Sequence, residues 1–170
     1  MVERRSQFVN PQASGLNLTA LRSWIKRSTI MILSRSSEYA IRAMTFLANQ
    51  PAGKLSGARE ISQAERIPMQ FLWKILQNLA RRRLIRSFKG MRGGYELALP
   101  AEKITLGMIV DVTDSTERFG RCVLGLPKCG DRHPCPLHET WKILRANFTS
   151  MLEDNTVADL AAITQGESNA

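Results

Sequence analysis

The sequence contains no apolar run that approaches roughly eighteen residues, the length that a helix needs to cross a bilayer. We therefore expect no membrane-spanning helix and no membrane partner. Cysteine is also scarce, with three residues in a chain of 170. An odd and small number of cysteines disfavours the disulfide framework of a secreted protein. The composition therefore predicts a cytoplasmic protein whose cysteines serve a metal or redox site.

Acidic residues are few in the first hundred residues. Residues 31–100 carry twelve Lys and Arg against four Asp and Glu, whereas residues 101–170 carry seven against ten. The net charge of +9 is thus concentrated in the N-terminal part, as expected for a surface that binds a polyanion such as DNA. Residues 1–30 show no regular apolar pattern, so we expect a flexible extension there.

Apolar spacing in the next segment predicts a helix-turn-helix. A helix is expected over 34–50, and Ser56 is expected to cap a short helix that ends at Ala64. A longer helix is expected over 68–83, because its apolar residues share one face while amide and basic side chains share the other. The predicted buried face consists of Phe71, Leu72, Ile75, Leu76 and Leu79. This arrangement presents a recognition helix to the major groove of DNA.

A β-hairpin wing is predicted directly after the recognition helix. Two short strands, Leu84–Phe88 and Tyr95–Leu99, flank a glycine-rich tip. From Arg81 to Arg92 there are six basic residues and no acid, and the tip glycines let the backbone approach a phosphate closely. Arg92 at the tip is the expected minor-groove probe. The alternative is that residues 81–83 are only the solvated end of a helix, where cations favour the dipole.

Three cysteines and a histidine form the second motif of the chain. Cys122, Cys129, Cys135 and His138 have the spacing C-x6-C-x5-C-x2-H. Glycine and proline are frequent among them, which predicts a loop held by a bound group rather than by regular structure. Pro136 suits the first turn of a following helix, so we expect Cys135 at the cap of that helix.

The ligand types leave the chemistry of this motif open. Three thiolates and an imidazole satisfy tetrahedral zinc, but zinc sites usually use tight C-x2-C pairs. The wider spacing here favours an iron-sulfur cluster. A metal-free thiol switch is a third alternative. A Cys-His nucleophile would need a cleft and an orienting partner that the sequence does not indicate, so we expect no enzyme.

A long helix is predicted after the cysteines. Its apolar residues repeat at spacings of four, three, four and three, as in a coiled-coil seam. The seam residues are Leu137, Trp141, Leu144, Phe148 and Met151. The pattern predicts a homodimer interface, with packing inside one chain as the alternative. Further short helices are expected over 105–112 and 155–163, followed by a flexible tail over 164–170.

Five segments together resemble the Rrf2 family of bacterial winged-helix regulators. They are SSEYAIRA at 36–43, AREI at 58–61, IP at 67–68, RGGYEL at 92–97 and CPLH at 135–138. The resemblance covers about Met31 to Ile163. It implies a cytoplasmic bacterial repressor, a homodimer that binds a palindromic operator in double-stranded DNA. It also implies an iron-sulfur cluster that senses iron, redox state or nitric oxide.

The resemblance also implies roles for individual residues. Gln70 and Lys74 would read bases, and the residues expected to contact DNA overall are Arg59, Gln70, Lys74, Lys89, Arg92, Gly93, Gly94 and Tyr95. The three cysteines would ligate the cluster. His138 matches the position that completes a 2Fe-2S site, and Glu38 of the partner subunit is the alternative fourth ligand. A 2Fe-2S cluster is therefore expected, with a 4Fe-4S cluster or zinc as alternatives.

Two features depart from the family pattern. Six residues separate the first two cysteines instead of five, and Trp73 places a large indole in the recognition helix. The expected fold is mainly α with a small β-hairpin wing. It comprises an extension over 1–30, a winged helix-turn-helix domain over 31–100, a cysteine-segment sensor with a long dimerisation helix over 101–163, and the tail.

Overall fold

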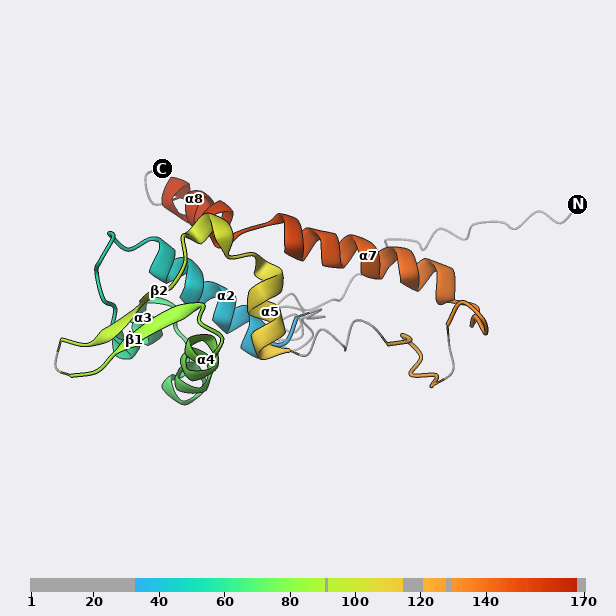
Figure 1. The fold of residues 1–170 in the computed structure, drawn as a ribbon, viewed down its shortest axis with the longest axis horizontal. Helices are drawn as coiled ribbons and strands as arrows, with labels where there is room; N and C mark the ends of the chain where they lie inside the picture. Colours follow the sequence, from blue (N-terminus) through green and yellow to red (C-terminus); the bar gives the residue numbers. More distant parts are fainter. Residues whose placement is uncertain (1–32, 91, 115–120, 128–129, 168–170) are drawn as a thin grey trace, which may run out of the picture. The chain divides into compact units, whose positions relative to one another are not determined.

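The computed structural model describes residues 33–90, 92–114, 121–127 and 130–167. The extension expected over 1–30 lies outside these residues. Within them, six α-helices and one antiparallel β-hairpin form the fold, as Figure 1 shows. This confirms the expected mainly α class with a β-hairpin wing.

Helix α2, Arg35–Ala48, is central to this fold and contacts α4, α5, α8 and β2. Its buried face includes Ala40, Ala43, Met44 and Leu47. The two alanines on this face are small enough to let neighbouring helices pack closely against α2. The expected helix over 34–50 is thus confirmed, with Ser34 as its N-cap.

The start of α2 is held by a buried carboxylate from a distant part of the chain. Asp114, at the end of α5 (Leu106–Thr113), accepts hydrogen bonds from the Ser34 amide at 3.1 Å and the Ser37 hydroxyl at 2.8 Å. A carboxylate at this position is favoured because the first amides of a helix lack partners within the helix. Asp114 therefore fixes α5 to α2, the helix on which α4 packs.

The helix-turn-helix consists of α3, Ala58–Ala64, and α4, Met69–Arg81. The prediction that Ser56 caps α3 was wrong. Gly57 is the N-cap, and the Glu60 side chain accepts a hydrogen bond from its amide at 3.3 Å. Ser56 instead exchanges backbone hydrogen bonds with Tyr95, at 3.0 and 2.9 Å. Its extended conformation adds a third segment beside the hairpin.

The turn between α3 and α4 is fixed by side chains. Arg66 has a φ of 51°, the left-handed conformation that commonly ends a helix. Arg42 of α2 forms an ion pair with Glu65 at 3.2 Å and also donates to the Glu65 carbonyl oxygen. The Ser62 hydroxyl donates to the carbonyl oxygen of Ile67 at 2.7 Å. These contacts set the angle between the two helices.

One side of α4 is buried much as its sequence predicts. Leu72, Ile75, Leu76 and Leu79 lie in the core. Phe71 was expected among them but is 49% exposed. Its ring lies beside Tyr39 of α2, with 6.5 Å between the centroids, at the edge of the core.

The wing consists of β1, Ile85–Phe88, and β2, Gly94–Leu97, each shorter than expected. Their register pairs Ile85 with Leu97 and Phe88 with Gly94. A side chain at Gly94 would approach within 2.9 Å of the Ser56 carbonyl oxygen. Glycine at this position therefore allows the wing to lie against the segment before α3.

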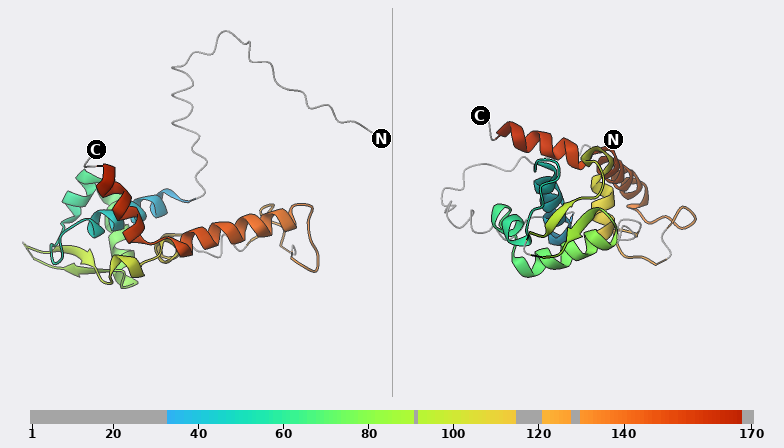
Figure 2. Two further views of the ribbon diagram at one scale, coloured as in Figure 1. Left: turned by 90° about the horizontal axis from the view of Figure 1, so that it is seen from above. Right: turned by 60° about the vertical axis from the view of Figure 1, so that its left-hand side comes forward.

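The second half continues with a 3-10 turn η1 (Ala101–Lys103), α5, the long helix α7 (His138–Asp154) and α8 (Val157–Glu167). Helix α8 packs on α2, and it extends past Ile163, where the helix was expected to end. Figures 1 and 2 show the C-terminal end of α7 beside α5. No helix among the described residues combines the length and apolar character needed to cross a membrane.

Candidate DNA-binding surface and cysteine segment

The outward side of α4 carries polar and basic side chains. Gln70, Lys74, Gln77 and Arg81 are exposed, at spacings of four, three and four residues. This spacing places them on one helical face, opposite the buried leucines and isoleucine. The face has amide donors and acceptors suited to base edges and cations suited to phosphates.

Basic residues near α4 extend this surface onto α3 and the wing. Arg59 is exposed on α3, and Lys89 and Arg92 are exposed at the wing tip. The tip turns through a hydrogen bond from the Gly93 amide to the Gly90 carbonyl oxygen at 3.0 Å. Because these cations are exposed, they could contact DNA without any change in the packing of the core.

Three of the expected DNA contacts have structural explanations of their own. Gly94 is buried, and a side chain at Gly93 would collide with the backbone of Phe88. Tyr95 is half-buried, and its backbone pairs with Ser56. The tip glycines are therefore required by the packing of the wing, whether or not a phosphate approaches them.

The cysteine segment brings two thiols together. Cys122 and Cys135 are half-buried, and their Sγ atoms lie 4.0 Å apart. A disulfide requires about 2.05 Å. Two thiolates on one tetrahedral metal, with bonds of about 2.3 Å, lie about 3.8 Å apart. The two described thiols therefore fit shared metal ligation, while Cys129 lies outside the described residues.

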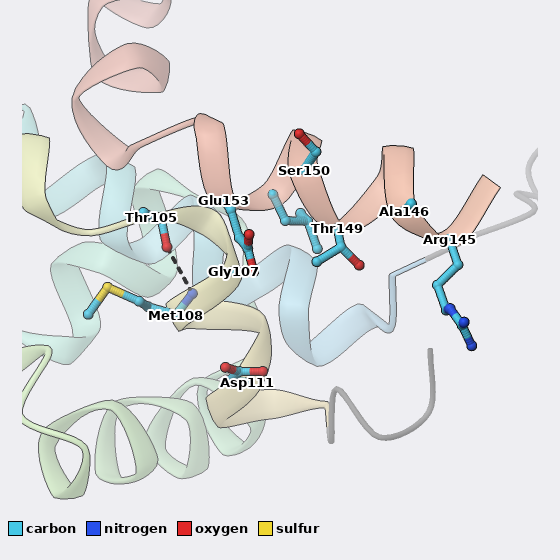
Figure 3. A pocket seen from close by; sticks show the side chains of 10 residues that line it. Thr105, Gly107, Met108, Asp111, Arg145, Ala146, Thr149, Ser150 and Glu153 are labelled. Atoms are coloured by element: carbon cyan, nitrogen blue, oxygen red, sulfur yellow. Dashed lines mark hydrogen bonds between the residues drawn. The ribbon is translucent and has the colours of Figure 1, made fainter. Parts of the chain in front are cut away.

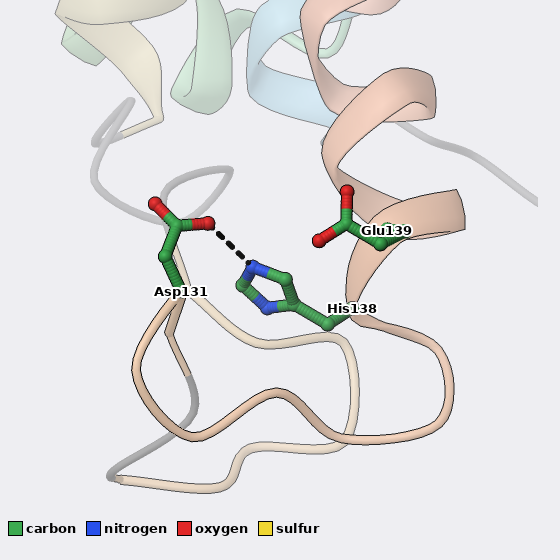
Figure 4. Close-up of side chains that lie close together, drawn as sticks. All are labelled: Asp131, His138 and Glu139. Carbon is green, nitrogen blue, oxygen red and sulfur yellow. Dashed lines mark hydrogen bonds and ion pairs between the residues drawn. The ribbon is translucent and has the colours of Figure 1, made fainter.

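His138 is directed toward an acidic residue, Asp131 (Figure 4). Its Nε2 lies 3.1 Å from Asp131 Oδ1, and Lys142 Nζ lies 2.9 Å from the same oxygen. Hydrogen bonds from Lys142 and then His138 lower the pKa of Asp131. In the described part of the chain, Asp131, His138 and Glu139 are the group whose metal-binding atoms lie within 4.8 Å of one another. Neither Asp131 nor Glu139 was predicted, because no sequence spacing linked them to His138.

The prediction that Cys135 caps α7 was wrong. Leu137 is the N-cap, and the helix begins at His138. The His138 amide donates to the Cys135 carbonyl oxygen at 2.9 Å, so a turn separates the thiol from the helix. Glu38, the alternative ligand, forms an ion pair with Arg42 at 3.5 Å within its own helix.

Both ends of the cysteine segment are attached to the first turns of α7. The indole nitrogen of Trp141 donates to the Arg121 carbonyl oxygen at 2.8 Å, just before Cys122. Near the other end, Asp131 is held by Lys142. A rearrangement of this segment would therefore act on α7 directly.

The predicted seam of α7 is largely uncovered. Leu137, Leu144 and Met151 are 46%, 56% and 48% exposed, while Trp141 and Phe148 are half-buried. Leu152, which is outside the seam, is the buried residue of this helix in the described chain. Among the described residues, packing within one chain buries a side chain of α7 near its C-terminal end.

A groove between α5 and α7 lies beside this C-terminal contact (Figure 3). It is lined by Met108 and Asp111 of α5 and by Arg145, Thr149 and Glu153 of α7, among others. None of the predicted ligands or DNA contacts that the structure describes lines it. The groove is thus separate from both the cysteine segment and the basic surface.

Comparison with known proteins identifies the family. The model of the Rrf2 family, described as iron-dependent transcriptional regulators, matches residues 33–163. The chain belongs to the Rrf2 family. An HTH-type transcriptional regulator, as it is named, from Mycobacterium tuberculosis (strain H37Rv) is 40% identical over 133 residues, 77% of this chain and 81% of the relative. The regulator NsrR of Shouchella clausii is 34% identical over 138 residues, 76% of this chain and 88% of the relative.

Solved structures agree on the fold of this Rrf2 protein. CymR, the global cysteine regulator of B. subtilis, gives a TM-score of 0.66 at 23% identity, covering 79% of this chain and 98% of CymR. IscR of T. potens gives 0.64 at 20% identity, covering 79% and 89%. The protein is a DNA-binding transcriptional regulator with a winged-helix fold, and not a Cys-His enzyme.

Proposed function

We propose that this Rrf2 regulator is a homodimeric repressor whose operator binding is controlled by an iron-sulfur cluster on Cys122, Cys129 and Cys135. The observation that carries the proposal is the 4.0 Å separation of the Cys122 and Cys135 sulfurs. These two residues are thirteen positions apart in the sequence, yet their sulfurs lie near the distance expected of two ligands on one metal. The cluster would make DNA binding responsive to iron, redox state or nitric oxide.

His138 is the proposed fourth ligand, which favours a 2Fe-2S cluster over 4Fe-4S. Its Nε2 is engaged by Asp131, an arrangement in which a carboxylate orients an imidazole while the other ring nitrogen ligates. Glu38 of the partner subunit is the alternative, and it would have to leave its ion pair with Arg42. Glu38 is the less favoured ligand because ligation would break this ion pair.

Zinc and a metal-free thiol switch are the competing proposals. The sulfur separation suits zinc as well, but the spacings of six and five residues are wider than those of usual zinc pairs. For a thiol switch, the sulfurs would have to approach by about 2 Å to form a bond. Iron, sulfide and zinc analysis of protein purified without oxygen separates the three, since only a cluster contributes acid-labile sulfide.

Dimerisation is proposed through the exposed seam of α7. An apolar stripe of this length in a single chain is unfavourable in water, and a second copy related by a twofold axis would cover it. Because the cysteine segment is attached to α7 through Trp141 and Asp131, a change in ligation would alter the placement of the two subunits. Two recognition helices must match the spacing of two half-sites, so a small rotation would lose contacts.

On DNA, α4 is proposed to enter the major groove and the wing tip to reach the adjacent minor groove. Gln70 and Lys74 would contact bases, and Arg59 and Lys89 would contact the backbone. Arg92 would lie at the minor groove. The exposure of these side chains supports this assignment.

Replacing Arg92 by alanine is expected to weaken operator binding several-fold. Because phosphates border the minor groove, losing this cation should also reduce the slope of log affinity against log salt by about 0.9 for each phosphate no longer neutralised. Fluorescence anisotropy at several salt concentrations measures both quantities. Lys103→Ala, an exposed cation of η1 away from the proposed surface, is the matched control. Equal affinities and slopes for Arg92→Ala and the wild type would remove the wing from the interface.

A further inference from the structure

Trp73 is an exposed aromatic residue within the proposed DNA-reading helix. It is the fifth residue of α4, and 56% of its surface is accessible. Gln70 precedes it by three residues and Gln77 follows it by four, so all three share a helical face. Trp73 thus lies in the N-terminal half of the helix, the part of a recognition helix that usually meets base edges.

Packing within the domain does not account for the indole. Phe71, also exposed on α4, is supported by the ring of Tyr39 at 6.5 Å. Trp73, by contrast, belongs neither to the described core nor to the half-buried apolar residues packed against it. A large apolar ring left in water forgoes the stabilisation that its burial would give. Its position among glutamines therefore needs an explanation beyond the packing of the described residues.

We infer that Trp73 reads the C5-methyl group of a thymine in the operator. This inference rests on the proposed entry of α4 into the major groove. The thymine methyl is the apolar feature that bases present there, whereas the other readable groups are hydrogen-bond donors and acceptors. Gln70 and Lys74 supply polar contacts, and the indole supplies the apolar surface that a methyl group requires. The operator should therefore contain a thymine in each half-site whose methyl group is essential.

The test does not require the operator sequence to be known, because a binding duplex can be obtained by selection from a library. The wild-type dimer selects its preferred sequence from a random duplex library. That sequence is then synthesised with deoxyuridine replacing one symmetry-related pair of thymines at a time. Affinities are measured for the wild type, Trp73→Ala and Gln77→Ala.

At one pair of thymines, the wild type is expected to lose about fourfold in affinity per half-site, or about fifteenfold for both, when the methyl groups are removed. Trp73→Ala should bind the thymine and uracil duplexes equally at that pair. Gln77→Ala should retain the full uracil penalty, because its side chain would read a different group. The uracil series on the wild type does not depend on the folding of any variant.

Two results would overturn the inference while leaving the DNA-binding proposal in place. One is a wild type that binds its selected duplex but is indifferent to every uracil substitution. The other is an unchanged uracil penalty in Trp73→Ala. Failure of the wild type to select any sequence would instead overturn the proposed use of α4, and this inference with it.

Discussion

Replacement of Cys135 by alanine is expected to remove iron and acid-labile sulfide from the protein. Cys135 lies 4.0 Å from Cys122 and is half-buried, so its loss would leave two thiolates at a site that needs three. A cluster with a missing thiolate would have a coordination position open to water, and the remaining ligands would hold it poorly. Visible absorption, iron and sulfide should all fall to background in protein purified without oxygen.

His133→Ala is the matched control for this experiment. His133 is exposed in the same segment, and its backbone pairs with Gly130. An alanine preserves that backbone pairing, so iron and sulfide should remain at wild-type levels. Retention of both in Cys135→Ala would contradict the ligand assignment. If the wild type contains zinc instead of iron, the cysteines form a structural zinc site and the iron-sulfur proposal is wrong.

The second large effect is expected from Leu144→Glu. Leu144 lies at the middle of the seam and is 56% exposed in the single chain, so the substitution should leave the fold of each subunit intact. In a dimer it would place two like charges in an apolar interface, which is strongly unfavourable. The protein should become monomeric, and operator affinity should fall by at least about 100-fold because the two half-sites are no longer bound together.

Thr149→Glu provides the control for an added charge on α7. Thr149 is exposed and lines the groove beside α5, and its five-residue separation from Leu144 places it on a different side of the helix. The Thr149→Glu protein should remain dimeric in sedimentation experiments and should bind the operator. A Leu144→Glu protein that stays dimeric at micromolar concentration would exclude the seam as the interface.

Local patterns in the sequence predicted the helices and the wing well. The spacing of Leu72, Ile75, Leu76 and Leu79 was sufficient to define the buried side of α4, since helical periodicity is a local property. Phe71 lies at the edge of that side, where its ring meets Tyr39 of α2 but stays 49% exposed.

Errors at element ends also had non-local causes. Ser56 has the chemistry of an N-cap, but its backbone pairs with Tyr95, about forty residues further along the chain. No local rule reveals that pairing. The contacts of Asp114 with the start of α2 likewise depend on how two distant helices pack.

For the candidate sensor, the sequence predicts which residue types could ligate a metal, but it does not predict how their side chains are arranged. Cysteine spacing pointed to a metal or redox site, and the close approach of Cys122 and Cys135 is consistent with that prediction. The pairing of His138 with Asp131 was missed, because proline and glycine between them give no regular spacing to interpret.

The most direct test of the proposed function is operator affinity measured for cluster-loaded and metal-free protein at the same salt concentration. Because the cysteine segment is attached to α7 by Trp141 and Asp131, loading should change affinity by at least about tenfold, and by linkage DNA should alter cluster stability in turn. Equal affinities for the two forms, both confirmed as dimers, would contradict control of DNA binding by the cysteine segment.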